Sequence, residues 1–159
     1  MRRCLAIVVA LLALSAGAAE EPSSCKGTLA GQVKGSFTCD VSVWTTEQGV
    51  PVLAIQARDP IDGVPSYAPG SFELPPPVRA GTYTLDELGM GKASVAAVGG
   101  TLYIASKTTG QRGEVKLVLL KVTENQKAKG TWIVHGTYRA RLIPAGAGKE
   151  GEVVVEVTF

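Results

Sequence analysis

The fold of this chain is decided by residues 131–143, which read TWIVHGTYRARLI. Apolar and polar side chains alternate along this segment, with Val134 and Tyr138 on one face and Thr137 and Arg139 on the other. Successive side chains of a β-strand point to opposite faces of its sheet. The segment is therefore expected to form a long strand with one buried face and one solvent-facing side.

The same period of two recurs along most of the chain. It predicts strands at residues 37–43, 52–57, 82–85, 93–98, 101–106, 114–123 and 153–159, with an edge strand at 28–34. Apolar side chains lie on both faces of residues 114–123, which favours a central strand. Gly99 and Gly100 suit a two-residue hairpin turn, in which both residues need a positive φ. We expect an all-β fold, an antiparallel β-sandwich of about eight to ten strands.

The first 19 residues have the three parts of an export signal. Two arginines open the chain, ten apolar residues follow at 5–14, and small residues occupy 15–19. We expect a signal peptide over residues 1–19, cleaved after Ala18 or Ala19. The alternative is an uncleaved anchor, for which the apolar run is too short. The rest of the chain, residues 20–159, is expected to form one domain.

Removal of a signal peptide changes the number of cysteines and the net charge of the mature protein. Cys4 leaves with the signal peptide, so Cys25 and Cys39 remain and are expected to form a disulfide in an oxidising compartment. The 16 basic residues include Arg2 and Arg3, so 14 remain beside 14 acidic ones and the mature protein is close to neutral. One histidine and two cysteines exclude a Cys- or His-rich metal site, and we expect no cofactor.

Residues 58–81 depart from the strand pattern. Six of the nine prolines lie there, including a run of three at 75–77, and proline cannot donate to a strand ladder. We expect a Pro-rich loop over 58–81 with a short strand at residues 71–74. Such a loop is either a rigid polyproline connector between sheets or a functional segment.

Basic residues are concentrated in the second half of the chain. Eight of them are candidates for one patch: Lys107, Arg112, Lys116, Lys121, Lys127, Lys129, Arg139 and Arg141. On one sheet face they would suit anionic glycans, lipopolysaccharide or phospholipid head groups. The alternative is that they are solvated lysines and arginines that protect strand edges from aggregation. Export and the lack of interleaved aromatic residues argue against nucleic acid.

Candidates for catalysis are few. His135 is the only histidine, and by alternation it shares a polar face with Thr137 and Arg139, so it is expected to point to solvent. No nucleophile motif accompanies it. Asp59 and Asp62 offer hard oxygen ligands for Ca²⁺, but they lack the alternate-residue spacing of a Ca²⁺ loop and suit ordinary turns. We therefore expect no catalytic residue and no metal site.

Four segments carry a resemblance to known proteins. They are GTYTL at 81–85, GEVKL at 113–117, GTYRARL at 136–142 and the closing V-x-V-x-V-x-F at 153–159. Together they resemble small exported bacterial β-sandwich proteins of unknown function. The resemblance implies a sandwich in the cell envelope, and it supplies no catalytic residues.

Three functions remain open on these grounds. The leading one is a periplasmic or secreted, non-catalytic binding or structural module, whose partner would be an anionic glycan, lipid head groups or another envelope protein. The second is a small outer-membrane β-barrel, because Phe159 closes a strand with alternating valines, as in barrel proteins. The third is a hydrolase acting on envelope polymers, for which the sequence offers only His135 and scattered carboxylates.

Overall fold

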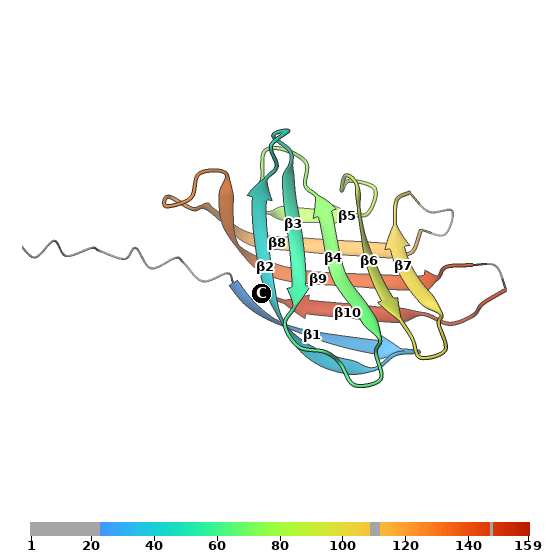
Figure 1. Ribbon diagram of the computed structural model, residues 1–159. Helices are drawn as coiled ribbons and strands as arrows, with labels where there is room; N and C mark the ends of the chain where they lie inside the picture. The colour runs from blue at the N-terminus through green and yellow to red at the C-terminus, as the bar shows by residue number, and fades with distance from the viewer. Residues whose placement is uncertain (1–22, 109–111, 147) are drawn as a thin grey trace, which may run out of the picture.

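The structure is a computed structural model that describes residues 23–108, 112–146 and 148–159 (Figure 1). The expected signal peptide lies outside these residues. The described chain forms ten strands: β1 (Ser23–Gly31), β2 (Gly35–Thr45), β3 (Pro51–Ala57), β4 (Ser66–Glu73), β5 (Gly81–Thr84), β6 (Gly91–Ala96), β7 (Leu102–Ser106), β8 (Glu114–Glu124), β9 (Thr131–Pro144) and β10 (Val153–Thr158). No described segment forms a helix that could cross a membrane.

The strands close into an antiparallel barrel. Around the ring the order is β10-β1-β2-β3-β4-β6-β7-β9, and β9 pairs with β10 to complete eight strands. Closure depends on β9, whose last residues pair with β7 through Ile104↔Ile143 and Tyr103↔Pro144. Beyond the ring, β8 pairs with β9 and β5 pairs with β8. The all-β prediction is confirmed, but the strands form a closed barrel where two separate sheets were expected.

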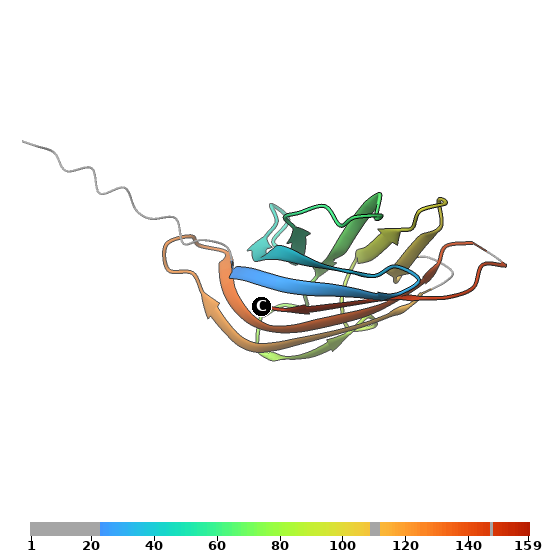
Figure 2. The ribbon, with the colours of Figure 1, turned by 90° about the horizontal axis from the view of Figure 1, so that it is seen from below.

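The barrel is flattened into two layers. Figure 1 shows β3, β4, β6 and β7 upright in front, crossing β8, β9 and β10 behind them at a steep angle. Figure 2 shows the same two layers from below, with the chain of β2 passing from one to the other. The early residues of β2 pair with β1, and its later residues pair with β3. The core fills the space between the layers.

The interior is packed with apolar side chains. On β9, Val134, Tyr138 and Leu142 are at most 2% exposed, whereas the intervening His135 and Arg139 are exposed. The alternation predicted for this strand, including a solvent-facing His135, is confirmed. Because the inward positions of the other strands are also buried and apolar, the barrel encloses a hydrophobic core.

Two predicted boundaries differ in the structure. The strand expected at the edge over 28–34 is β1, which begins at Ser23 and lies between β10 and β2. Its pairing with the last strand of the chain leaves no local trace in the sequence. The expected Pro-rich loop at 58–81 contains the eight-residue β4, longer than the predicted 71–74. Pro69 is tolerated because the β4–β6 register is irregular between Ala68 and Ser71.

The long strand β8 changes register part-way along. It lies between β9 and β5, as the apolar pattern of 114–123 predicted for a central strand. A bulge between Leu119 and Lys121 leaves Leu120 on the outside, 70% exposed. After the bulge, Val122 faces Val134 and packs against the core. The turn between β6 and β7 has the predicted positive φ at both Gly99 and Gly100. It is longer than the expected two residues, because β6 ends at Ala96 and β7 begins at Leu102.

The hydroxyl of Tyr138 is buried in the barrel without a hydrogen-bond partner among the described residues. Burial raises the pKa of this phenol far above its ordinary range, so the group stays neutral. An unpaired buried hydroxyl is destabilising. We therefore expect Tyr138→Phe to raise the free energy of unfolding by about 1 kcal/mol in urea denaturation.

A matched tyrosine variant is expected to have the opposite effect on the free energy of unfolding. The hydroxyl of Tyr83 donates to the carbonyl of Arg79 at 2.7 Å. Tyr83→Phe is therefore expected to lose about 1 kcal/mol of stability. A Tyr138→Phe variant that loses as much as Tyr83→Phe would show that the Tyr138 hydroxyl has a stabilising partner.

Candidate functional site

Six strands carry one row of facing residues across the outside of the back layer. The register places Thr84 of β5 opposite Lys116 of β8, and Lys116 opposite Arg139 of β9. The row continues through the following pairs: Arg139↔Glu156, Glu156↔Thr28 and Thr28↔Ser36. Five inter-strand steps of about 4.8 Å give the row a length of about 24 Å. All six side chains therefore lie along one line perpendicular to the strands.

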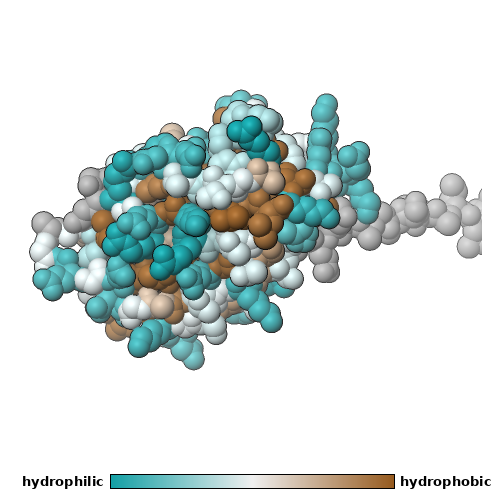
Figure 3. Space-filling model, turned by 180° about the vertical axis from the view of Figure 1, so that it is seen from behind, coloured by the Kyte–Doolittle hydropathy of each residue, from teal (hydrophilic) through white to brown (hydrophobic). Residues whose placement is uncertain are grey.

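This row runs through three adjoining depressions. The largest, about 690 Å³, lies over β10, β1 and β2, and the second, about 460 Å³, lies over β8 and β9 next to β5. A third of about 330 Å³ lies between them and shares Glu156 and Thr158 with the first and Lys116 and Arg139 with the second. We call the three together the outer groove. Figure 3 views the molecule from this side and shows mostly hydrophilic side chains, with hydrophobic groups between them.

The outer groove brings together half of the predicted basic patch. Four of the eight residues line it: Arg112 and Arg141 at one end, and Lys116 and Arg139 between that end and the centre. Lys107 does not line the groove, and its Nζ donates to the backbone carbonyls of Asp86 and Leu88, both at 2.7 Å. Lys121 lies opposite His135, and Lys127 and Lys129 lie in the turn between β8 and β9. The eight residues thus do not form one patch.

Carboxylates accompany the arginines of the groove. Arg139 donates through Nε to Glu156 at 3.0 Å, and Arg141 donates to Glu114 at 2.6 Å and to Glu152 at 3.2 Å. The hydrogen bond from Arg141 lowers the pKa of the Glu114 carboxyl. These pairs are exposed, so they orient the guanidinium groups more than they stabilise the fold.

Hydrogen-bond donors remain available between these pairs. Arg139 uses only Nε in its pair with Glu156, and a guanidinium has five N–H groups in all. Lys116 makes no ion pair or side-chain hydrogen bond with the described chain. The centre of the outer groove therefore presents an ammonium and the two terminal nitrogens of a guanidinium to solvent.

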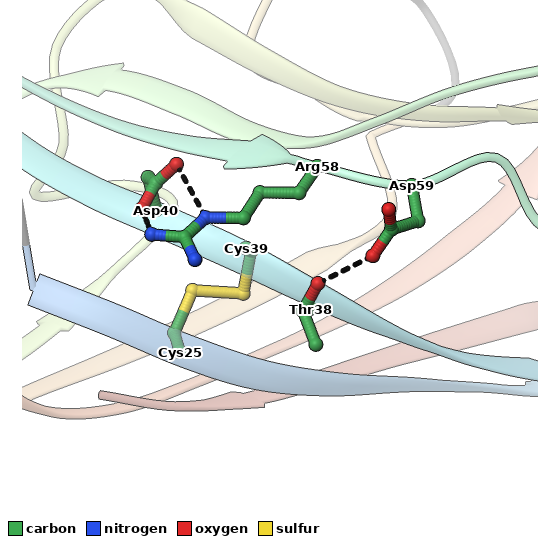
Figure 4. The surroundings of a disulfide bond; sticks show 6 residues. All are labelled: Cys25, Thr38, Cys39, Asp40, Arg58 and Asp59. Carbon is green, nitrogen blue, oxygen red and sulfur yellow. Dashed lines mark hydrogen bonds and ion pairs between the residues drawn. A yellow bond between two sulfur atoms is a disulfide. The ribbon is translucent and has the colours of Figure 1, made fainter.

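The other end of the groove is rich in hydroxyl groups. Thr28, Ser36 and Thr38 line it together with Lys26 and Asp59. Thr38 donates to the Asp59 carboxylate at 2.7 Å (Figure 4). This end thus offers hydroxyls beside one cation, Lys26, and two carboxylates, Asp59 and Glu156.

A disulfide holds the two strands at this end. Cys25 of β1 lies directly opposite Cys39 of β2, and the two are joined, as predicted. Figure 4 shows the ion pair of Arg58 and Asp40 beside the disulfide. The hydrogen bond from Arg58 lowers the pKa of the Asp40 carboxyl. Covalent and ionic links therefore fix β1, β2 and the end of β3 together.

The residues considered for catalysis do not converge. His135 is exposed on the outside of β9, Asp59 borders the outer groove, and Asp62 is exposed in the turn before Val64. Within the described ranges, no three His, Cys, Asp or Glu side chains are grouped as metal ligands. The three residues considered for catalysis thus lie apart, and the described part of the groove offers hydrogen-bond donors and charges.

Half of the groove was missed by sequence reasoning. Lys26, Thr28 and Glu156 meet because β10 lies between β9 and β1, a pairing of the chain's two ends. The one available signal was the polar set of positions in the alternating segment 153–159, which predicted that Glu156 faces solvent.

Comparison of the chain with protein-family models, curated proteins and solved structures gave no match. The chemistry of the outer groove is therefore the basis for proposing a function.

Proposed function

We propose that this protein is an exported, non-catalytic binding module that holds an acidic polysaccharide along the outer groove. The observation that carries the proposal is the unbroken row across six strands, from Thr84 to Ser36, through three adjoining depressions. A groove about 24 Å long suits a linear polymer better than a compact ligand. An interior ligand is not favoured, because buried apolar side chains pack the barrel.

The pattern of charge defines the ligand further. Five basic residues line the groove, and four carboxylates are interspersed among them: Asp59, Asp86, Glu114 and Glu156. A ligand with a negative charge on every unit would meet some of these carboxylates. A chain whose carboxylates are separated by neutral, hydroxyl-bearing sugars suits a groove that has cations at its centre and one end and the hydroxyls of Thr28, Ser36 and Thr158 towards the other.

The location of the protein is proposed from its first residues, its disulfide and the outer face of β9. The signal-like residues 1–19 and the Cys25–Cys39 disulfide support export to an oxidising compartment. On β9 the outward positions include His135, Thr137 and Arg139, whereas a barrel in the outer membrane presents apolar residues to lipid. We therefore propose a soluble periplasmic or secreted protein, in keeping with the resemblance to exported envelope proteins.

The first test is binding of a hyaluronan hexasaccharide, which has one carboxylate for every two sugars, by titration calorimetry. The double variant Lys116→Ala/Arg139→Ala is expected to weaken binding roughly 10- to 100-fold, because it removes charge-assisted hydrogen bonds at the centre of the groove. Affinity of the unaltered protein is expected to fall with added salt.

The turn between β8 and β9 provides the control. Lys127→Ala/Lys129→Ala removes the same net charge outside the groove and is expected to leave the affinity unchanged. Equal losses in the two variants would show non-specific attraction and contradict the proposal. Binding to anionic lipid vesicles but not to the oligosaccharide would favour a head-group ligand. Shortening of the oligosaccharide during incubation would show an enzyme.

A further inference from the structure

Both tryptophans of the chain line a second depression, away from the outer groove. Trp44 of β2 and Trp132 of β9 are half-buried and lie where β2 pairs with β9, through Trp44↔Thr131 and Val43↔Trp132. Trp132 is opposite the buried Val43 and packs against the core, whereas Trp44 is on the outer face, opposite Thr131. Both line a depression of about 260 Å³. No residue that lines the outer groove lies in this second depression.

The depression lies at a fork in the barrel wall. Along one edge of β9, residues 137–142 pair with β10, and Gly136 exchanges backbone hydrogen bonds with Phe159. On the same edge, Thr131 and Trp132 pair with β2. Residues 133–135 make no ladder pairing on that edge in the described chain. A binding site is favoured here because strands diverge and leave space between side chains that elsewhere would touch.

The lining of this depression is uncharged. It contains no Lys, Arg, Asp, Glu or His, whereas each part of the outer groove contains charged side chains. Its polar side-chain groups are the hydroxyls of Ser23, Ser42 and Thr131, the amide of Asn125 and the indole N–H groups. Thr131 donates to the carbonyl of Ala128 at 2.6 Å, so its oxygen remains an acceptor. Asn125 accepts from the Lys127 N–H at 2.9 Å, so its two amide N–H groups remain donors.

We infer that this fork is a binding site for a neutral sugar ring. A pyranose has an apolar C–H face, which can be buried against the flat indole of Trp44, and hydroxyls at its edge, which suit Ser42, Thr131 and Asn125. No lining residue carries a charge that would pair with an acidic ligand, so a neutral one is favoured. The volume is below the 300–1,000 Å³ or so of drug-sized sites, so the site takes a single sugar.

Tryptophan fluorescence tests this inference directly. Because the chain has only two tryptophans and both line the site, a change in emission reports this depression and not the outer groove. The disulfide-bonded protein is titrated with N-acetylglucosamine, mannose and glucose. A saturable change in emission is expected for at least one of them, and no change with any of the three would overturn the inference.

Variants assign the binding to named side chains. Trp44→Ala is expected to weaken sugar binding at least tenfold, and Ser42→Ala several-fold. NMR spectra of the sugar measure the binding in each variant. Ser42→Ala removes only a hydroxyl, so it keeps the test valid if Trp44→Ala fails to fold. Unchanged affinity in both folded variants would overturn the inference, as would tighter binding of N-acetyl-leucine amide than of any sugar.

The two proposed sites can be tested independently of each other. Lys116→Ala/Arg139→Ala leaves the fork untouched and is expected to keep the fluorescence response to the sugar. Loss of that response in this variant would show that sugar binding at the fork depends on the outer groove and would overturn a separate site.

Discussion

Replacing Cys25 and Cys39 together with alanine is expected to lower the free energy of unfolding by about 3 kcal/mol. The disulfide closes a loop with a sequence separation of 14 residues and so restricts the unfolded chain. Both cysteines are buried, at 4% and 0% exposure, so the substitution also removes packed sulfur atoms from the core. Urea denaturation of the oxidised protein and of the double variant measures the difference.

The reduced protein is the control for this change. With dithiothreitol present, the unaltered protein should unfold close to the midpoint of the double variant, because both lack the covalent link. A double variant as stable as the oxidised protein would show that pairing of β1 with both β2 and β10 already fixes this corner.

The disulfide also bears on the proposed binding. Lys26 and Thr38 lie on the two strands that it joins, and both line the hydroxyl-rich end of the outer groove. Reduction at a temperature where the protein remains folded is expected to weaken binding of a long oligosaccharide more than that of a short one. The short one would contact only the end formed by Arg112 and Arg141.

Gly136→Ala is expected to destabilise the protein by about 3 kcal/mol, as overpacking against rigid atoms does. A Cβ at this position would lie 2.0 Å from the carbonyl oxygen of Val118 and 3.0 Å from its carbonyl carbon. These are backbone atoms of the facing strand, so no side-chain rotation relieves the clash. Thermal unfolding followed by circular dichroism measures the loss.

Gly81 provides a matched glycine at the end of the same group of strands. A Cβ there would approach nothing closer than 3.8 Å, the ring of Tyr83, and Gly81→Ala is expected to leave stability nearly unchanged. Comparable losses in the two variants would mean that flexibility, not the close approach of β8 to β9, explains the need for glycine at 136.

The Gly136 position also shows what a local pattern can and cannot predict. Alternation in residues 131–143 predicted both the strand and its buried face, because the period of two reflects the geometry of any strand. It did not predict that β9 would pair with β8, β10, β2 and β7 at different points along its length. Those pairings turn the expected sandwich into a barrel.

The candidate sites show the same division. Arg112, Lys116, Arg139 and Arg141 were predicted as basic residues of one patch, and the structure brings these four together. Lys121, Lys127 and Lys129 are close to them in sequence but lie away from the groove, since a hairpin carries its turn to one end of the sheet. The depression that Trp44 and Trp132 both line was not predicted, because the two residues come from strands far apart in the chain.

The sequence by itself determined that this protein is all-β, which strand faces are buried, and that Cys25 and Cys39 form a disulfide. These are properties of neighbouring residues or of a simple count. Only the tertiary structure decided that the barrel closes, that polar groups of six strands form one groove, and that two tryptophans share a fork. The physical reason is that alternation specifies which face of a strand is buried, whereas the choice of neighbouring strand depends on how all the strands pack around one core.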